Sequence, residues 1–483
     1  MTFRRTKIVA TLGPASSSPE VLEQLILAGL DVARLNFSHG TPDDHKARAA
    51  LVRELAAKHG RHVALLGDLQ GPKIRIAKFE NKRIELKEGD MFRLSSSHSR
   101  TAGTQEVVGI DYPALIQDCD VGDELLLDDG RVVMRVELKG ADELHCRVII
   151  GGPLSDNKGI NRRGGGLTAP ALTEKDKADI KLAAEMDLDY LAVSFPRDAA
   201  DMEYARRLLT EAGGNAWLVA KIERAEAVAD DEALDGLIRA SDAVMVARGD
   251  LAVEIGDAEL VGIQKKIIAH ARRYNKAVIT ATQMMESMIH SPMPTRAEVS
   301  DVANAALDYT DAVMLSAESA AGEYPVEAVQ AMARVCLGAE KHPTSKQSSH
   351  RLGRTFERCD ESIALATMYT ANHFPGVKAI ISLTESGYSP LIMSRIRSSI
   401  PIFAFTPHRE AQARVALFRG VYTVPFDPAS LPANKVSQAA VDELLKRGVV
   451  EPGDWVILTK GDSYHGTGGT NTMKILHVGD QMV

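Results

Sequence analysis

The sequence lacks the residue patterns of secreted, disulfide-bonded or membrane-spanning proteins. Only four of its 483 residues are cysteine (Cys119, Cys146, Cys336 and Cys359), and they lie far apart with no CxxC or CxxH pair. We therefore expect buried structural thiols in a reducing compartment, and neither a disulfide framework nor a zinc site. No stretch reaches the roughly 18–20 uninterrupted apolar residues of a membrane-spanning helix, and no signal-peptide apolar core follows the N-terminus. These absences predict a cytoplasmic protein without a membrane partner.

The chain also lacks a strong excess of charge of one sign. It carries 65 acidic and 57 basic residues, which gives a formal net charge of -8. This mild acidity provides no electrostatic reason to expect a nucleic-acid partner. Apolar residues make up 45% and charged residues 25%, an ordinary globular composition that excludes a collagenous, coiled-coil or mostly disordered chain. At about 100–200 residues per domain, the length predicts roughly three domains.

Short, β-branched apolar runs alternate with helical patterns along much of the chain. Continuous apolar runs of this length are typical of strands buried on both faces of a parallel sheet. The expected strands are 7–13, 32–38, 63–70, 190–196, 217–223, 243–250, 277–284 and 312–319. Helix starts are expected at Ser18 and Thr41, each followed by proline, and at Thr295, which forms a capping box with Glu298. Eight strand-plus-helix units predict an α/β fold, a (β/α)8 TIM barrel.

One connection of this barrel is abnormally long. About 120 residues separate the third and fourth expected strands, far more than a normal connection between a strand and a helix. Within it, short alternating segments at 83–87, 124–127, 131–138 and 143–150 stand between turn signals and predict an inserted all-β lid domain, a β-barrel over 71–167. The segment 161–166 (NRRGGG) closes the insert and could serve as a hinge.

The remaining chain divides around this insert. We expect the catalytic barrel over 1–70 and 168–345, and a C-terminal α/β regulatory domain over 346–483. Strands of that last domain are expected near 378–384, 401–406, 455–460 and 474–478. The region of Arg395, Arg397 and 419–422 is expected to be solvated surface or subunit contact.

Polar residues gather where the expected barrel strands end, which is where barrel enzymes form their active sites. Glu223 and Asp250 follow adjacent strands, and two carboxylates with room for water and substrate suit Mg²⁺ or Mn²⁺. Lys221 lies two residues before Glu223, so the two side chains share one face of the strand. Together with Arg34 and Arg75, these groups predict a site for an anionic, phosphorylated substrate. Any one of them, including the Lys221–Glu223 pair, could instead be a structural ion pair.

The other expected strand ends carry further polar or special residues. They are Asn36, Ser38, His39, Asp68, Ser194, Phe195, Arg248, Gly249, Thr282, Ser316 and Glu318. Because each follows an apolar run that already buries its own strand, the set as a whole indicates a site rather than a folding requirement.

Six segments along the chain resemble pyruvate kinase. They are 33–40 (ARLNFSHG), 68–75 (DLQGPKIR), 220–223 (AKIE), 246–251 (VARGDL), 281–284 (ATQM) and the run from 300–305 (SDVANA) through 314–316 (MLS). The likeness covers essentially the full chain in the same order, with the insert in the same barrel loop, and is closest to a bacterial form. It implies transfer of the phosphoryl group of phosphoenolpyruvate to ADP, giving pyruvate and ATP in the last step of glycolysis.

The resemblance also implies roles for the reacting groups. Glu223 and Asp250 would bind the divalent metal, Lys221 would stabilise charge on the moving phosphoryl group, and Arg34 would hold the phosphate. The backbone around Gly249 and Asp250 would meet the substrate carboxylate. A proton would reach the enolate near Thr282, with Ser316 as a second candidate.

Nucleotide and monovalent-cation residues follow from the same resemblance. Pro14, His39 and Arg75 would face the nucleotide, which the inserted domain covers when it closes; the preferred nucleoside diphosphate is left open. The matching monovalent-cation ligands are Asn36, Ser38, Asp68 and the carbonyl of Leu69.

The sequence departs from the family pattern at Lys73. Many potassium-dependent members carry glutamate there, in a Gly-Pro-Glu-Ile-Arg segment. A lysine ammonium near the cation pocket could replace the monovalent ion, so we expect little or no potassium requirement. Ala317 and Ser319 also stand where glycine and threonine are usual.

Thr384, Ser386, Gly387 and Ser389 precede a helix-like segment at 390–397. Hydroxyls and a glycine at a helix N-terminus can cradle a phosphate, although such turns are also common helix caps. The resemblance implies a phosphorylated allosteric effector at this loop, with 461–471 as a cover. A sugar monophosphate is favoured, while AMP and fructose bisphosphate remain open. The family further implies a homotetramer.

Two other readings remain. A metal-dependent aldolase or lyase would also stabilise a pyruvate enolate on a barrel, although Lys221 beside Glu223 and the inserted lid favour phosphoryl transfer. A non-catalytic sugar-phosphate sensor is the alternative outside enzymes, and the intact set of Lys221, Glu223, Asp250, Thr282 and Arg34 argues against it.

Overall fold

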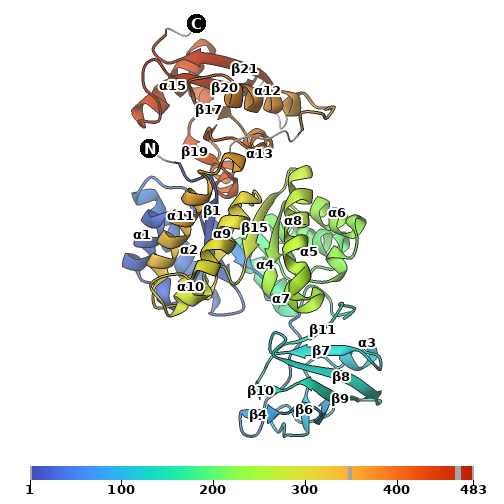
Figure 1. The fold of residues 1–483 in the computed structure, drawn as a ribbon. Helices are drawn as coiled ribbons and strands as arrows, with labels where there is room; N and C mark the ends of the chain where they lie inside the picture. Colours follow the sequence, from blue (N-terminus) through green and yellow to red (C-terminus); the bar gives the residue numbers. More distant parts are fainter. Residues whose placement is uncertain (1–2, 346–350, 463–468, 481–483) are drawn as a thin grey trace.

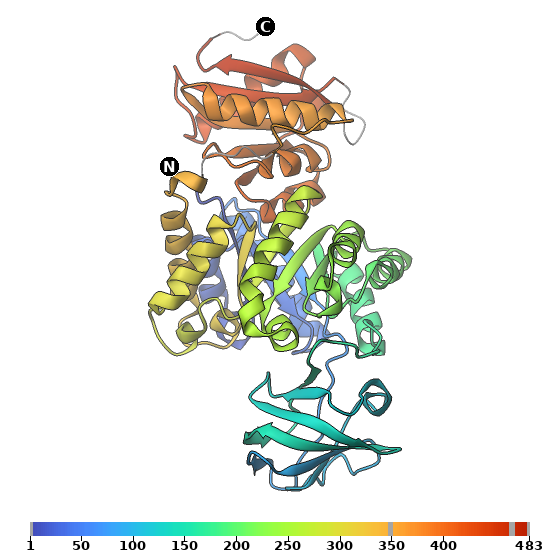
Figure 2. The same cartoon turned by 45° about the vertical axis from the view of Figure 1, so that its right-hand side comes forward.

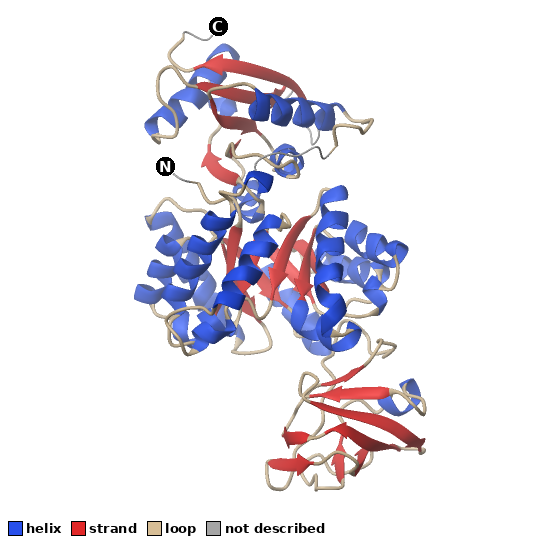
Figure 3. Cartoon of the chain, viewed as in Figure 1, coloured by secondary structure: helices blue, strands red, loops and turns tan. Residues whose placement is uncertain are grey.

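The computed structural model describes residues 3–345, 351–462 and 469–480. Three bodies lie in a row: a barrel in the middle, a β-rich insert beyond one end of it and an α/β domain beyond the other (Figures 1 and 2). Figure 3 shows the strands of the barrel enclosed by helices, as the predicted fold class requires. The (β/α)8 barrel with an inserted β domain and a C-terminal α/β domain is thus confirmed.

The barrel is a closed, parallel sheet in the order β1-β16-β15-β14-β13-β12-β3-β2. Its strands are β1 (Lys7–Leu12), β2 (Val32–Asn36), β3 (Ala64–Asp68), β12 (Tyr190–Val193), β13 (Trp217–Ile222), β14 (Ala243–Ala247), β15 (Ala277–Ala281) and β16 (Ala312–Leu315). Every strand lies within its predicted run and stops earlier, because the polar residues at its carboxyl end leave the sheet. The polar residues of one rim therefore lie either at the last positions of the strands, as Asn36 and Asp68 do, or on the loops that follow them.

Helices surround the barrel and begin at the predicted capping residues. The Ser18 side chain accepts a hydrogen bond from the Val21 amide, and Thr41 and Thr295 form capping boxes with Asp44 and Glu298. The longer helices are α1 (Pro19–Ala28), α2 (Pro42–Lys58), α4 (Glu174–Glu185), α5 (Ala199–Glu211), α6 (Asp231–Ala240), α8 (Asp257–Arg273), α9 (Arg296–Leu307) and α11 (Pro325–Ala339). Shorter helices α7 (Arg248–Ile255) and α10 (Ala317–Ala320) follow β14 and β16 directly.

The insert contains strands β4 (Arg83–Leu86), β5 (Met91–Ser95), β6 (Val107–Gly109), β7 (Glu124–Leu127), β8 (Val132–Lys139), β9 (Glu143–Ile150), β10 (Gly152–Ser155) and β11 (Ile160–Arg162), with a short helix α3 (Leu115–Asp118). They form a six-stranded sheet, β11-β7-β8-β9-β5-β6, and a separate two-stranded sheet of β10 and β4. The predicted closed β-barrel is therefore wrong: the edge strands β11 and β6 do not pair, so the insert is a half-barrel around an apolar core.

The C-terminal domain is a five-stranded sheet in the order β19-β18-β17-β20-β21. Its strands are β17 (Val377–Leu383), β18 (Ile402–Thr406), β19 (Val421–Pro425), β20 (Trp455–Gly461) and β21 (Thr470–His477), and its helices are α12 (Cys359–His373), α13 (Tyr388–Ser394), α14 (Arg409–Arg414) and α15 (Val436–Lys446). Strand β19 was not predicted, because its short apolar run follows an arginine-containing segment that reads as surface.

The C-terminal domain forms the floor of the barrel. Apolar side chains from inside the barrel, such as Val9 and Ile279, belong to one buried cluster with Leu391 and Phe418 of that domain. Tyr190 is fully buried, and its hydroxyl donates a 2.6 Å hydrogen bond to the carbonyl of Arg414. Burying a large apolar side chain completely contributes about 1.5–3 kcal/mol, so the two domains share part of their stabilisation.

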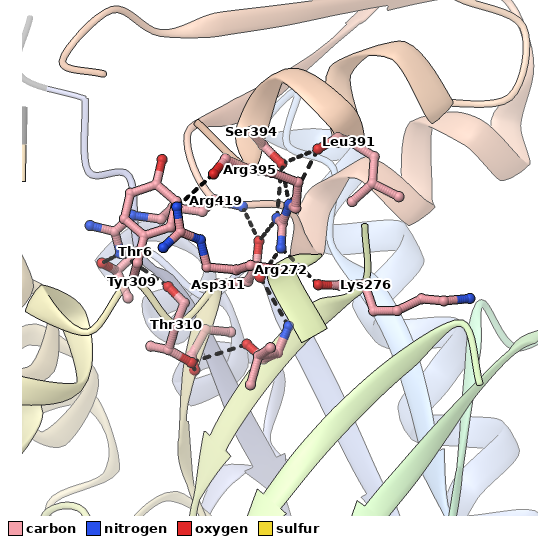
Figure 4. A network of polar contacts seen from close by, with 12 residues as sticks. Thr6, Arg272, Lys276, Tyr309, Thr310, Asp311, Leu391, Ser394, Arg395 and Arg419 are labelled. Atoms are coloured by element: carbon pink, nitrogen blue, oxygen red, sulfur yellow. Dashed lines mark hydrogen bonds and ion pairs between the residues drawn. The ribbon is translucent and has the colours of Figure 1, made fainter. Parts of the chain in front are cut away.

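Arg395 and Arg419 lie in this floor, which corrects their predicted surface position. Both are among the largest fully buried side chains, and Arg395 forms a bidentate ion pair with buried Asp311. The Arg419 amide donates to the same carboxylate at 2.9 Å, and its guanidinium donates to Thr6 Oγ1 at 2.6 Å (Figure 4). Arginine is almost never fully buried unless it is paired. Because the partner, Asp311, is distant in sequence, the local sequence shows no sign of the pairing, and the surface prediction for these two arginines was wrong.

Three of the four cysteines, Cys119, Cys146 and Cys336, are buried as predicted, whereas Cys359 is exposed at the first residue of α12. Over the parts of the chain that the structure describes, none of the helices combines the length and the apolar character needed to span a bilayer.

Candidate active site at the mouth of the barrel

Lys221 stands at the centre of the polar rim. It is the fifth residue of β13, and its ammonium lies 2.7 Å from Ser194 Oγ and 3.4 Å from both Asp68 Oδ1 and Glu223 Oε2. Burial alone would lower the pKa of Lys221, but the two carboxylates outweigh it and raise the pKa. Lys221 therefore carries a fixed positive charge beneath the mouth.

Arg34 supplies a second cation from the neighbouring part of the rim. Its Nε donates to Asp68 Oδ2 at 2.7 Å and its Nη1 donates to Thr11 Oγ1 at 2.8 Å. Burial would raise the pKa of Asp68, but Arg34 and Lys221 together hold this pKa below its usual value. Asp68 is thus an ionised anchor, 1% exposed, that orients both cations.

Glu223 follows the last residue of β13 and is almost completely buried. Its side chain is 1% exposed, and its Oε1 accepts a 2.9 Å hydrogen bond from the Phe195 amide. Burial, opposed by Lys221 and reinforced by Asp250 and Asp68, raises the pKa of Glu223 to about 7. A buried carboxylate that ionises with difficulty gains most from a cation placed beside it.

Asp250 comes from the first turn of α7 rather than from a strand. The predicted strand through 250 is wrong in this part, because β14 ends at Ala247 and helix geometry begins at Arg248. Asp250 Oδ1 lies 3.5 Å from Lys73 Nζ, and its side chain is 23% exposed. Its charge raises the pKa of Glu223, so the two carboxylates are near enough to interact.

These oxygen atoms fit a divalent metal only in part. Within the described residues, no group of three His, Cys, Asp or Glu side chains is arranged to hold a metal ion. A metal ion at this place could take at most two carboxylate ligands, from Glu223 and Asp250, and water or substrate oxygen atoms would have to complete a six-coordinate shell. Mg²⁺ commonly binds in this way, through one or two carboxylates plus substrate phosphate.

Thr282 stands in a strained turn beyond β15. Its φ of 66° and that of Gln283, 55°, lie in the left-handed region that residues with a Cβ rarely adopt. Thr282 Oγ1 accepts a 2.8 Å hydrogen bond from the Gly249 amide and donates to the Ala281 carbonyl. The carbonyl of Thr282 accepts from Arg248 Nη2 at 2.7 Å, so a buried arginine holds this turn in place.

The residues after β16 contribute fewer groups to the mouth than those after β13 and β14. Ser316 is the residue before α10, and its amide donates to Glu318 Oε2 at 2.7 Å. Glu318 is 2% exposed and also accepts from the Met285 amide at 3.2 Å. Both oxygen atoms of Glu318 thus bind backbone amides, which gives this member of the predicted rim a structural role.

The three predicted nucleotide residues lie on two different bodies. Pro14 and His39 are exposed on the barrel rim, after β1 and β2. Arg75 belongs to the base of the insert, where its Nη1 donates to the Asn157 carbonyl at 2.9 Å. Any ligand that contacts all three must lie between the barrel and the insert.

The residues matching monovalent-cation ligands adjoin Asp68. The Ser38 amide donates to Asn36 Oδ1 at 3.0 Å, and the Leu69 carbonyl accepts from Ser194 Oγ at 2.7 Å. Lys73 Nζ lies 3.5 Å from Asp250 and 3.9 Å from Asp129 of the insert. Its charge therefore lies beside Asp250 at the mouth.

The insert rejoins the barrel through three glycines in the left-handed region. Gly164, Gly165 and Gly166 have φ values of 81°, 78° and 89°, which residues with a Cβ adopt only at a cost. The Gly164 amide donates to the Glu254 carbonyl at 2.9 Å, and the Gly166 amide donates to Glu226. This segment is therefore a link with permissive backbone angles that is bonded to Glu226 and Glu254 of the barrel.

At the other end of the molecule, the predicted effector loop caps α13. The Gly387 amide donates to Thr384 Oγ1 at 3.0 Å, and Gly387 has a φ of 84°. Ser389 Oγ shares a 2.6 Å hydrogen bond with Thr470 Oγ1, while Ser386 is half-buried. The helix begins at Tyr388, two residues before the predicted start, and 463–468 of the covering loop lie outside the described residues.

The sequence located most of this rim but missed some supporting groups. Thr11 was not singled out, because a threonine inside an apolar strand run gives no signal of its own. Ser194, Phe195 and Arg248 were located at strand ends without a role. Their hydrogen bonds to Lys221, Glu223 and Thr282 come from long-range pairing that only the closed barrel creates.

Comparison with known proteins gives the same relationship over nearly the whole chain. Residues 3–329 match the family model described as "Pyruvate kinase, barrel domain", and residues 361–476 match "Pyruvate kinase, alpha/beta domain". Pyruvate kinase II of Salmonella typhimurium is 59% identical over 477 residues, covering 99% of each chain. A pyruvate kinase of Haemophilus influenzae is 56% identical over 470 residues, covering 97% of each chain. A pyruvate kinase of Geobacillus stearothermophilus is 43% identical over 481 residues, covering 99% of this chain and 81% of that one.

Proposed function

This chain belongs to the pyruvate kinase family and is a phosphotransferase, and from that premise we propose which of its groups perform the reaction. The reaction moves a phosphoryl group from phosphoenolpyruvate to ADP and yields pyruvate and ATP. Membership decides against the aldolase or lyase and the non-catalytic sensor considered above. The observation that carries the proposal is the ammonium of Lys221, held at the mouth between Asp68 and Glu223.

Lys221 stabilises the negative charge of the phosphoryl group during transfer. Catalysis of this step depends mainly on positioning and charge neutralisation. Because Asp68 and Glu223 raise its pKa, Lys221 stays protonated at neutral pH. Arg34, oriented by Asp68 and Thr11, holds the phosphate of the substrate.

Glu223 and Asp250 hold the divalent cation, Mg²⁺ or Mn²⁺. When bound, this cation would polarise substrate oxygen atoms and neutralise their charge. The protein contributes a partly dry pocket and two carboxylates whose mutual repulsion the cation relieves.

The substrate carboxylate is received by backbone N–H groups at the start of α7, near Gly249 and Asp250. The first amides of a helix have no intrahelical partner and favour an anion. The hydroxyl of Thr282 accepts from the Gly249 amide and so lies beside the substrate carboxylate. It is near the route by which a proton reaches the enolate. Ser316 is the second candidate for that step.

Pro14, His39 and Arg75 contact the nucleotide when the insert closes over the mouth. The glycines at 164–166 support this motion, because they permit backbone angles that other residues resist. The closed form would bring Arg75 of the insert towards the phosphates of ADP.

Lys73 replaces the monovalent cation that Asn36, Ser38, Asp68 and the Leu69 carbonyl would otherwise bind. Its ammonium, 3.5 Å from Asp250, already provides a positive charge at the mouth. Activity without potassium follows from this substitution.

The loop of Thr384, Ser386, Gly387 and Ser389 binds a phosphorylated effector, with a sugar monophosphate as the favoured class. The hydroxyls of Thr384 and Ser386 support this assignment, because they accept from the amides of Gly387 and Tyr388 at the start of α13 and gather donors and acceptors there. On the same family grounds we propose a cytoplasmic homotetramer.

The decisive experiment is a coupled assay of pyruvate formation from phosphoenolpyruvate and ADP with Mg²⁺. We expect Lys221→Met to lower kcat by about 10³-fold or more while the protein stays folded. Lys265→Met is the matched control, because Lys265 is a 52% exposed lysine that also pairs with a carboxylate. Turnover of Lys221→Met at the level of Lys265→Met would refute the role of Lys221.

A further inference from the structure

The loop after β12 contacts both of the groups to which the reaction is assigned. Ser194 Oγ lies 2.7 Å from the ammonium of Lys221, and the next residue, Phe195, donates its amide to Glu223 at 2.9 Å. Two consecutive residues thus hold the proposed transfer lysine and a proposed metal ligand. This loop comes from a different strand than Lys221 and Glu223, so its contacts fix both groups from outside their own element.

The direction of the hydrogen bonds at Ser194 is set by chemistry. An ammonium has three donors and no acceptor, so the Ser194 hydroxyl must accept from Lys221. The single proton of that hydroxyl then goes to the nearer of two acceptors, the Leu69 carbonyl at 2.7 Å, because Asp68 Oδ1 lies 3.5 Å away. The resulting chain runs from Lys221 through Ser194 to Leu69.

This contact is shorter than the ion pairs of the same ammonium. Both Asp68 Oδ1 and Glu223 Oε2 lie 3.4 Å from Lys221 Nζ, against 2.7 Å for Ser194 Oγ. Ion pairs with two carboxylates do not by themselves fix the position of the ammonium of a flexible lysine side chain. A short hydrogen bond to a fixed hydroxyl does fix that position.

The hydroxyl is fixed because its surroundings leave it no room. Ser194 is 1% exposed, and a Cβ at Gly71 would lie 2.6 Å from the Ser194 Cβ. The following residue, Phe195, has a φ of 55°, in the left-handed region that a side chain disfavours. Such strain persists at functional sites where the surrounding structure enforces it.

We propose that Ser194 is a positioning residue for phosphoryl transfer: its hydroxyl fixes the ammonium of Lys221 and ties it to the Leu69 carbonyl. The inference rests on the transfer role assigned to Lys221 above. Ser194 itself acts through Lys221. Since Leu69 is also a proposed monovalent-cation ligand, Ser194 connects that pocket to the transfer lysine through one hydroxyl.

The test compares Ser194→Ala and Ser194→Cys with wild type in the coupled assay. The thiol keeps the shape of the side chain but is a weak hydrogen-bond partner, so Ser194→Cys decides the matter if the alanine variant does not fold. We expect kcat to fall about 10- to 100-fold, as for a misplaced catalytic group. The KM for phosphoenolpyruvate should change by less than about threefold, because Arg34 and the metal ligands are untouched.

Ser241→Ala is the matched control. Ser241 is also 1% exposed and donates a 2.8 Å hydrogen bond to a backbone carbonyl, that of Leu237, before the amino end of β14. It should show a similar loss of thermal stability and an unchanged kcat. An equal fall in kcat for Ser241→Ala, or wild-type kcat in a folded Ser194 variant, would overturn the proposal.

A double-mutant cycle separates this role from a purely structural one. In the Lys221→Met background, measured at high enzyme concentration, Ser194→Ala should cause no further loss of kcat, because the group it positions is gone. A full second loss would contradict the proposal. Wild-type turnover of Lys221→Met alone would instead refute the role of Lys221 on which the inference rests.

Discussion

Arg395 and Asp311 form a bidentate ion pair in which neither side chain is more than 1% exposed, and which joins the C-terminal domain to the residue immediately before β16. The same carboxylate also accepts from the Val278 amide of β15 at 2.9 Å. One aspartate therefore ties two barrel strands to the other domain. Such a pair stabilises the native packing only while both partners are present.

Arg395→Met should destabilise the protein strongly. Removing one partner leaves the Asp311 carboxylate buried and uncompensated, at a cost of about 3–5 kcal/mol. We expect the thermal unfolding midpoint to fall by about 3–5 °C. Arg447→Met is the control, because Arg447 pairs with Glu443 on the surface and is 38% exposed. Equal shifts of the unfolding midpoint for the two variants would show that the buried ion pair stabilises the protein no more than the surface pair does.

Replacing Lys73 by glutamate should create a potassium requirement. Wild type is expected to give the same initial rate in potassium-free and potassium-rich buffer, because Lys73 supplies the positive charge. Lys73→Glu removes this charge and places a carboxylate near Asp250, so its rate should rise at least about tenfold on adding K⁺, which corresponds to roughly 1.4 kcal/mol. Many-fold activation of wild type by potassium would refute the assignment of Lys73.

Glu223→Gln should weaken binding of the divalent cation without unfolding the barrel. The amide keeps an oxygen for the Phe195 N–H, and burial already raises the pKa of Glu223 to about 7, so the neutral side chain is well tolerated. Mn²⁺ binding followed by electron paramagnetic resonance should be at least about tenfold weaker than in wild type. Glu259→Gln, in the first turn of α8, is the control. Unchanged Mn²⁺ affinity in Glu223→Gln would remove this residue from the metal site.

Asp189→Asn should stabilise the protein at neutral and alkaline pH but not in acid. Burial raises the pKa of Asp189 from 3.8 to about 6, even though its carboxylate accepts a 2.7 Å hydrogen bond from the Leu65 amide. The folded state therefore binds the proton more tightly than the unfolded state. The contribution of Asp189 to the free energy of unfolding is lost as pH rises from about 4 through 6, and the loss amounts to roughly 3 kcal/mol.

The amide variant cannot ionise, so the loss should be absent from it. Chemical unfolding at pH 4 and pH 8 measures the difference. Asp120→Asn, whose parent side chain is 82% exposed, should show no such dependence. If wild type and Asp189→Asn unfold with the same pH dependence, the buried carboxyl of Asp189 does not titrate as described.

Ser386→Ala combined with Thr384→Val should abolish the response to a phosphorylated effector. The hydroxyls at this loop now bind the amides of Gly387 and Tyr388. The measurement is phosphoenolpyruvate saturation of wild type and variant with a sugar monophosphate, AMP and fructose bisphosphate in turn. Ser430→Ala, on the surface of the same domain, should respond like wild type. No response of wild type to any of the three would remove the effector site.

The barrel could be predicted from the sequence because its strands are buried on both faces. Apolar runs such as 217–223 and 277–284 therefore indicate a strand by themselves, whichever strands they pair with. The ends of the strands were predicted less well. Helix α7 begins at Arg248, directly after β14, and nothing in the local sequence distinguishes the last strand residue from the first helical one. The closure of the insert also failed as a prediction, because it depends on whether two edge strands meet.

The residues of the rim could be predicted from the sequence, but the hydrogen bonds among them could not. The positions of Lys221 and Glu223 follow from strand periodicity. The hydrogen bonds that make Asp68 an anchor, or Ser194 an acceptor, join residues more than 25 positions apart. Arg395 and Arg419 were misplaced for the same reason, since the aspartate that makes their burial tolerable is 84 and 108 residues away.

The hydroxyl of Tyr190 on the Arg414 carbonyl has a consequence for how such proteins diversify. A barrel whose floor is furnished by another domain cannot be exchanged as a cassette, because recombination that brought in an unrelated C-terminal partner would leave Asp311 and Tyr190 facing water. The insert is joined to the barrel by two chain segments at the opposite rim and contacts it through polar pairs such as Lys73 with Asp250. The barrel and the domain that closes its floor must therefore be inherited together.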